Sequence, residues 1–146
     1  MSSEILQFKI ILNGTHWNKL PEFSVWLDNE KITHGEADND CILEFSRKVE
    51  DGAHSLSIRL ENKTPEDTRT QAGNIVSDML LNIKDIEIDD ISLGNLLWDA
   101  EYILDEPQFY NNSQITHLDR CVNLGWNGTY KFQFSSPFYL WLLEKV

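Results

Sequence analysis

The side chains with the clearest capacity for chemistry in this 146-residue chain are four histidines and two cysteines. The histidines lie far apart, without the close His-x-x-x-His type of spacing that brings two ligands to one metal ion; they are His16, His34, His54 and His117. His117 and Cys121 are four residues apart in a segment expected to be irregular, so a nucleophile pair is the less favoured alternative. Carboxylates are numerous, but glycoside hydrolysis needs a specific facing pair, which a sequence does not place. The sequence therefore predicts a protein that is not an enzyme.

Aromatic side chains are the second group that could bind a ligand. Flat rings match the apolar faces of sugars, and four aromatic residues have polar neighbours that favour an exposed position: Trp17, Trp26, Tyr110 and Trp126. These four are the candidate ligand-binding residues. Because most tryptophans in proteins are buried in packing, we expect two of the four to belong to the core or to an interface.

The charge balance limits the partners. The chain has 12 Lys and Arg against 24 Asp and Glu, a formal net charge of −12. Proteins bind nucleic acids and anionic membrane surfaces through clustered Lys and Arg. The composition therefore argues against both nucleic acids and membranes as partners. No window approaches the ~20 apolar residues of a membrane span. The acidic start Met1-Ser-Ser-Glu predicts no signal peptide, and Cys41 and Cys121 are expected to be reduced rather than joined, as in a cytoplasmic protein.

The elements that must position these residues centre on two apolar runs within residues 54–91. In the first run, apolar residues alternate with polar ones in the period of two that marks a half-buried strand: Leu56, Ile58 and Leu60. In the second run, Leu81 and Ile83 share one parity, whereas Ile86 and Ile88 share the other. A β-bulge near residues 84–85 would let all four point to the same side. The two runs predict the centre of an antiparallel sheet.

Further strands are expected along most of the chain: residues 4–12, 22–27, 31–34, 41–49 (with Ile42 and Phe45 inward), and a final hairpin of 121–125 with 129–134. Asn13-Gly14 and Asn127-Gly128 are expected to be turns, and residues 107–119 irregular. The last ten residues favour a short helix, with Ser136 as its N-cap and Pro137 at its first position. The sequence predicts one all-β domain over residues 1–146, an antiparallel, jelly-roll-like β-sandwich with a short C-terminal helix.

Residues 41–91 also resemble a known family. The stretch Gly52-Ala-His-Ser-Leu-Ser-Ile-Arg-Leu, followed by Asp78 and by Ile86-x-Ile88, is similar to the calcium-dependent, xylan-binding type of carbohydrate-binding module. The resemblance implies binding of a polysaccharide and a calcium site at Asp78, with Asp67 or Glu66 from the long preceding loop. Calcium takes six to eight oxygen ligands, which loop carboxylates and carbonyls can supply. Solvated loop carboxylates without a metal are the alternative, and the chain departs from the family pattern in having only the Asp of its Asp-Arg-Asn strand opening.

Taken whole, the acidic chain and its ending Gly125-Trp-Asn-Gly-x-Tyr-x-Phe-x-Phe also resemble accessory virion proteins of tailed bacteriophages. That resemblance implies a non-enzymatic capsid-decoration or tail-associated protein, assembled in the host cytoplasm in many copies and bound to other virion proteins. The apolar C-terminal segment would then contact a neighbouring subunit. We expect this structural role, with binding of surface glycans as a further property and a polysaccharide-binding module as the alternative; no cofactor is expected apart from the calcium of that alternative.

Overall fold

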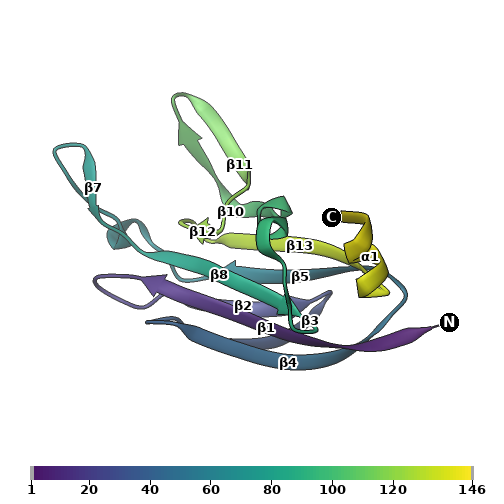
Figure 1. The fold of residues 1–146 in the computed structure, drawn as a ribbon. Helices are drawn as coiled ribbons and strands as arrows, with labels where there is room; N and C mark the ends of the chain where they lie inside the picture. The colour runs from purple at the N-terminus through teal and green to yellow at the C-terminus, as the bar shows by residue number, and fades with distance from the viewer. Residues whose placement is uncertain (1, 146) are drawn as a thin grey trace.

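The computed structural model describes residues 2–145, and for Tyr110 it describes the backbone alone. Two antiparallel sheets face each other across one apolar core (Figure 1). The first sheet has five strands, in the order β12 (Asn123–Leu124), β8 (Leu80–Ile88), β1 (Ser3–Thr15) and β4 (Cys41–Glu50), with β9 (Ile91–Ser92) beside β8. The second has six, in the order β11 (Ser113–Asp119), β10 (Glu101–Tyr110), β13 (Gly128–Ser136), β5 (Gly52–Leu60), β2 (Glu22–Leu27) and β3 (Glu30–Glu36). The predicted sandwich with a C-terminal helix is confirmed.

Alternation along the strands decides which side chains enter this core. On β5, Leu56, Ile58 and Leu60 are fully buried, as their period of two predicted. On β4, Phe45 packs inward and stacks on Phe8 of β1, with ring centroids 4.7 Å apart. Ile42 is 57% exposed, so its predicted core position is wrong. It has the opposite parity to Phe45, and a regular strand cannot turn both inward.

The bulge expected in the second apolar run lies at Lys84. Along the β1–β8 pairing, Ile11 faces Asp85 and the next residue, Leu12, faces Ile83, which leaves Lys84 without a partner. Residues on both sides of the bulge therefore point into the core, where the four apolar side chains are buried: Leu81, Ile83, Ile86 and Ile88. The bulge prediction is confirmed.

Two hairpins extend beyond the sandwich (Figure 1). One is made by β6 (Arg69–Gln71) and β7 (Asn74–Ser77), which follow the 3-10 turn η1 (Pro65–Asp67). The other is β10–β11, so the prediction of irregular structure over residues 107–119 is wrong. Its two-residue turn, Asn111-Asn112, has positive φ at both positions, which Asn tolerates better than most residues.

The predicted final hairpin is also corrected. β12 joins β8 in the first sheet, whereas β13 lies between β10 and β5 in the second. Residues 125–127 therefore cross from one sheet to the other rather than forming a tight turn. Asn13-Gly14 is likewise no turn, because β1 continues through it to Thr15.

The chain ends in the helix α1 (Phe138–Lys145), which packs on β13. Ser136 is not its N-cap. The Ser136 hydroxyl donates to the Glu4 carboxylate, and the same carboxylate accepts the Phe138 N–H at 2.7 Å. A second 3-10 segment, η2 (Gly94–Asp99), links β9 to β10. Within residues 2–145, no helix has the length and apolarity needed to cross a bilayer.

Candidate ligand-binding cleft

A cleft of about 510 Å³ opens where the two hairpins leave the sandwich. Three segments line it: the chain after β5, the middle of β10, and the crossing between β12 and β13. The lining residues are Lys63, Thr64, Pro65, Thr68, Asp105, Glu106, Gln108, Trp126 and Asn127. The lining combines one aromatic ring with carboxylate, amide and hydroxyl groups, which can form hydrogen bonds with a polar organic ligand.

An irregularity in β10 places the two carboxylates of the cleft. Ile103 faces His117 across the hairpin and Gln108 faces Ile115, so four residues, 104–107, lie opposite one. Bulges of this kind redirect side chains beside functional sites. Here the bulge turns Asp105 and Glu106 into the cleft, while the Asp105 N–H donates to the Asn127 carbonyl at 3.0 Å.

Gly128 allows this part of β10 to come close to β13. A Cβ atom at position 128 would collide with the carbonyl oxygen of Ile103 and lie 3.0 Å from the Cα of Leu104. Gly128 pairs with Leu104 at the last register position that β10 shares with β13. Beyond it, β10 has no partner on that side, and the hairpin diverges to form one wall of the cleft.

Trp126 stands on a crossing segment that is fixed from two directions. On the core side, the hydroxyl of buried Tyr102 accepts the Trp126 N–H at 2.9 Å and donates to the Trp126 carbonyl. On the side of the loop after β5, the Asn127 amide group donates to the Lys63 carbonyl at 2.9 Å and accepts the Lys63 N–H at 2.8 Å. Trp126 as a whole is 37% exposed. The cleft therefore presents a partly exposed ring on a rigid support.

Lys63 lines the cleft, and its side chain is only 9% exposed. Its ammonium donates to the Asp78 carboxylate and to the Gly125 carbonyl, both at 2.6 Å. The same Asp78 oxygen accepts the Thr68 hydroxyl at 2.6 Å and the Met79 N–H at 2.8 Å. Burial raises the pKa of Asp78, but these hydrogen bonds, led by that from Lys63, outweigh it and hold the pKa below its ordinary value. Asp78 is thus held in its ionised form, with three donors on Oδ1.

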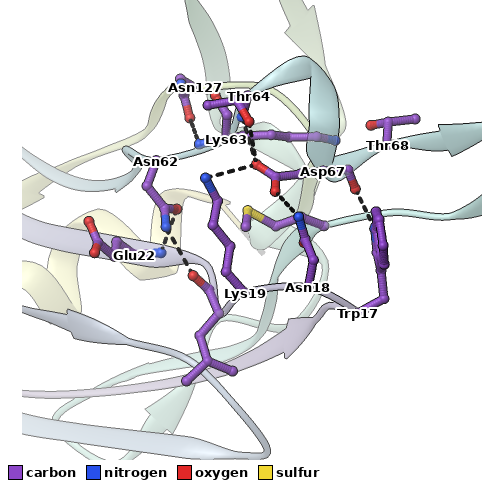
Figure 2. A network of polar contacts seen from close by, with 12 residues as sticks. Trp17, Asn18, Lys19, Glu22, Asn62, Lys63, Thr64, Asp67, Thr68 and Asn127 are labelled. Atoms are coloured by element: carbon purple, nitrogen blue, oxygen red, sulfur yellow. Dashed lines mark hydrogen bonds and ion pairs between the residues drawn. The ribbon is translucent and has the colours of Figure 1, made fainter.

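Asp67 forms a second buried centre nearby (Figure 2). Its carboxylate accepts from the Asn18 amide at 2.7 Å and the Thr64 N–H at 2.7 Å, and the Lys19 ammonium lies 3.2 Å away. Burial raises the pKa of Asp67, but the hydrogen bonds from Thr64, Asn18 and Lys19 lower it by more, so the pKa lies below its ordinary value. Asp67 ties the segment after β1 to the loop after β5.

The three aromatic candidates whose side chains the structure describes do not come together. Trp126 lines the cleft. Trp17 is 43% exposed but lies outside it, with its indole N–H bonded to the Asp67 carbonyl at 2.8 Å and the Arg69 guanidinium over its ring. Trp26 is partly buried on β2 and donates to the Ser24 hydroxyl. Tyr110 ends β10, and its side chain lies outside the described residues.

Of the residues that line the cleft, only Trp126 was anticipated from the sequence; those missed include three polar residues of β10, Asp105, Glu106 and Gln108. They flank Pro107, which interrupts the alternation of β10 and made the segment look irregular. The run Asp-Glu-Pro within a strand is itself the available signal, because Pro in a strand marks an edge or a bulge.

The two carboxylates proposed for calcium do not fit that ion as they are arranged. Asp67 has donors on both of its oxygens, including the Lys19 ammonium, and Asp78 has the Lys63 ammonium and two further donors on Oδ1. Calcium requires oxygen atoms with free lone pairs. Among residues 2–145, no group of three or more His, Cys, Asp or Glu side chains is placed to hold a metal ion. Cys41 and Cys121 are free thiols, and burial raises the pKa of both.

Comparisons with known proteins place the fold. No protein-family model matches the sequence, and no curated protein matches it. Among solved structures, vCBM60 in complex with galactobiose has a TM-score of 0.54 and 10% identity, over 86% of this chain and 96% of that one. The selenomethionine form of vCBM60, described as linking two families of calcium-dependent carbohydrate-binding modules by circular permutation, also has a TM-score of 0.54 at 10% identity, over 87% and 89%. The chain is therefore similar to carbohydrate-binding modules in fold.

Proposed function

We propose that this protein is a non-catalytic carbohydrate-binding protein that holds part of a sugar chain in the Trp126 cleft. The observation that carries the proposal is the rigidly supported, partly exposed Trp126 ring between carboxylate and amide groups. The C–H face of a sugar ring packs on a flat aromatic surface, and its hydroxyl groups donate to carboxylates and exchange hydrogen bonds with amides. Glu106 and Gln108 provide these groups beside the ring.

The size of the cleft and the fold support the same function. About 510 Å³ lies within the range of roughly 300–1,000 Å³ typical of small-ligand sites. The structural neighbours are carbohydrate-binding modules, one of them in complex with galactobiose. Because fold alone does not determine function, the proposal rests on the cleft and uses the fold as support.

The ion pair of Asp105 favours binding over hydrolysis. The Arg59 guanidinium donates to the Asp105 carboxylate at 2.8 Å. Glycoside cleavage needs one protonated carboxyl group as a general acid, with a second carboxylate facing it across the bond. An ion-paired Asp105 next to Glu106 on one strand does not supply that arrangement.

The direct test is calorimetric titration with galactobiose and a glycan array, using the wild type, Trp126→Ala and Trp98→Ala. Trp98 is 38% exposed, close to the 37% of Trp126, but does not line the cleft, so it is a matched control. We expect sugar affinity to fall at least about tenfold in Trp126→Ala and to be unchanged in Trp98→Ala. Equal affinity of Trp126→Ala and wild type, or no glycan bound by the wild type, would refute the proposal.

A virion component remains the second candidate, and one surface favours it. The outer face of α1 exposes three apolar side chains, Tyr139, Leu140 and Leu143, each more than half exposed. Such a face is typical of a contact with another protein. Mass spectrometry of purified phage particles tests this candidate, which predicts the chain as a multicopy component of the capsid or tail.

A further inference from the structure

We propose that the Lys63 ammonium is a built-in cation that holds the floor of the cleft together, so that the protein folds and binds sugar without calcium. The part of this inference that concerns folding stands on Lys63 and its contacts alone. The part that concerns binding rests on the function proposed above. The inference contrasts with the calcium dependence named for the structural neighbours.

The contacts of Lys63 join three separate segments. Lys63 itself follows β5, Asp78 precedes β8, and Gly125 follows β12. The ammonium lies 2.6 Å from an Asp78 oxygen and 2.6 Å from the Gly125 carbonyl oxygen. A carboxylate and a carbonyl from different segments, converging on one positive charge, are oxygen ligands of the kind that a bound calcium ion gathers. Here a side chain of the protein supplies that charge.

The same arrangement is unfavourable for a calcium ion at Asp78. Its Oδ1 atom already accepts from Lys63, Thr68 and the Met79 N–H, which leaves only Oδ2 for a metal. A divalent cation at this carboxylate would meet the ammonium within a few ångströms, and like charges at that distance repel strongly in a partly buried site. Binding of calcium would require Lys63 to leave a position in which its side chain is only 9% exposed.

Asp67 follows the same principle at the second predicted calcium position. Its carboxylate side chain is 1% exposed, and Lys19 reaches it at 3.2 Å from the segment after β1. Figure 2 shows Lys19, Asn18 and Thr64 converging on this carboxylate. Asp67 and Asp78 thus each have their own lysine. The negative charges of these two carboxylates are balanced by side chains of the protein, which is the balance a metal would otherwise provide.

Lys63 also connects this centre to the proposed ligand. Lys63, Thr68 and Trp126 all line the cleft, and Gly125 immediately precedes Trp126. Loss of the ammonium would release the Gly125 carbonyl and leave the partly buried Asp78 carboxylate without its counter-ion, which is a destabilising change. We therefore expect Lys63 to affect both the stability of the fold and the position of Trp126.

The first measurement uses the wild-type protein alone. Its melting temperature is compared in EDTA and in millimolar calcium chloride, and calcium is titrated calorimetrically without sugar. A ligand that binds only the folded state raises stability. The inference therefore predicts that the two melting temperatures differ by less than about 1 °C and that the calcium titration shows no heat of binding. A clear fall of the melting temperature in EDTA would overturn the inference, whether or not any sugar binds.

The second measurement uses Lys63→Met, which keeps the length of the side chain and removes its charge. We expect a fall in melting temperature of about 5 °C or more. The double variant Lys63→Met with Asp78→Asn removes both charges and should recover part of this loss. Lys48→Met, an exposed lysine on β4, is the matched control and should leave the melting temperature unchanged. Equal melting temperatures of Lys63→Met and wild type would overturn the inference.

The third measurement separates this inference from the proposed function. Galactobiose affinity of the wild type is compared with and without EDTA. Equal affinity supports both proposals, whereas affinity that disappears in EDTA overturns calcium independence and keeps sugar binding. If galactobiose does not bind at all, the proposed function fails with this probe, and the melting-temperature comparisons still decide the role of Lys63.

Discussion

The hydroxyl of Tyr102 bonds both backbone polar groups of Trp126, accepting the N–H at 2.9 Å and donating to the carbonyl. Tyr102 is fully buried on β10, and burial raises the pKa of its hydroxyl far above the ordinary value, so it stays a donor. The position of Trp126 is therefore set from the core of the sandwich. The strand that supplies this hydroxyl also carries Asp105 and Glu106, which fixes ring and carboxylates relative to each other.

Removal of that hydroxyl should weaken both the fold and the cleft. In Tyr102→Phe, the Trp126 N–H and carbonyl lose their partner in a partly buried position, which costs about 1–3 kcal/mol. Urea unfolding should show this loss, and sugar affinity should fall because Trp126 is less well held. Tyr139→Phe, at a position 61% exposed on α1, is the control and should match wild type. Unchanged stability in Tyr102→Phe would contradict this role of the hydroxyl.

Glu4 connects the two ends of the chain. Its carboxylate accepts the Phe138 N–H at 2.7 Å at the start of α1, which is the position a capping side chain takes. We expect Glu4→Ala to reduce the free energy of unfolding by about 0.5–2 kcal/mol and to speed hydrogen exchange in α1. Glu4→Gln, which keeps an acceptor oxygen, should lose less. Glu44→Ala on the exposed side of β4 is the control; similar exchange in all three variants would exclude Glu4 as the cap.

The sequence predicts a strand well where one face of the sheet is buried. The parity change between Ile83 and Ile86 has one solution that buries both residues, namely an extra residue between them, and Lys84 is that residue. Such alternation depends on the residues of one strand alone. It identifies the inward face of β5 and β8 correctly, because burial is decided position by position.

Alternation does not say which strands become neighbours. Residues 121–125 and 129–134 are close in sequence, yet β12 pairs with β8 and β13 pairs with β10 and β5. The cap of α1 comes from Glu4, 134 residues away from Phe138. The cleft has the same origin, because Trp126 was predicted but its neighbours Asp105 and Glu106 depend on a bulge and on contacts between distant segments.

The charge of the cleft predicts its preference among sugars. Asp105 and Glu106 line it; the charge of Asp105 is paired with Arg59, and the positive charge of Lys63 is paired with Asp78. We expect galactobiose to bind about fivefold or more tightly than digalacturonic acid at low salt, because a negatively charged sugar near Glu106 is repelled. Glu106→Gln should reduce the difference, and added salt should do the same. Calorimetry measures both affinities; equal or tighter binding of the acidic disaccharide would contradict the prediction.

His54 should make the stability of the fold depend on pH near neutrality. Its Nδ1 lies 2.8 Å from an Asp28 oxygen and its Nε2 lies 2.6 Å from the Glu50 carbonyl, so both ring nitrogens face acceptors and both should carry protons. Burial lowers the pKa of His54, but the Glu50 carbonyl and then the Asp28 carboxylate raise it by more. The net pKa lies above the ordinary value of about 6.5.

A pKa that is raised in the folded state means that the folded state binds the proton more tightly than the unfolded chain does. The stabilisation is therefore fully present below about pH 6.5 and is lost as the pH rises through the folded pKa. We expect the free energy of unfolding of the wild type to fall over that range, and to fall less in His54→Gln. His117→Gln, an exposed histidine on β11, keeps the wild-type profile. Urea unfolding at a series of pH values measures these profiles, and a wild-type stability that rises from pH 6 to pH 8 would show that His54 is not held as the imidazolium.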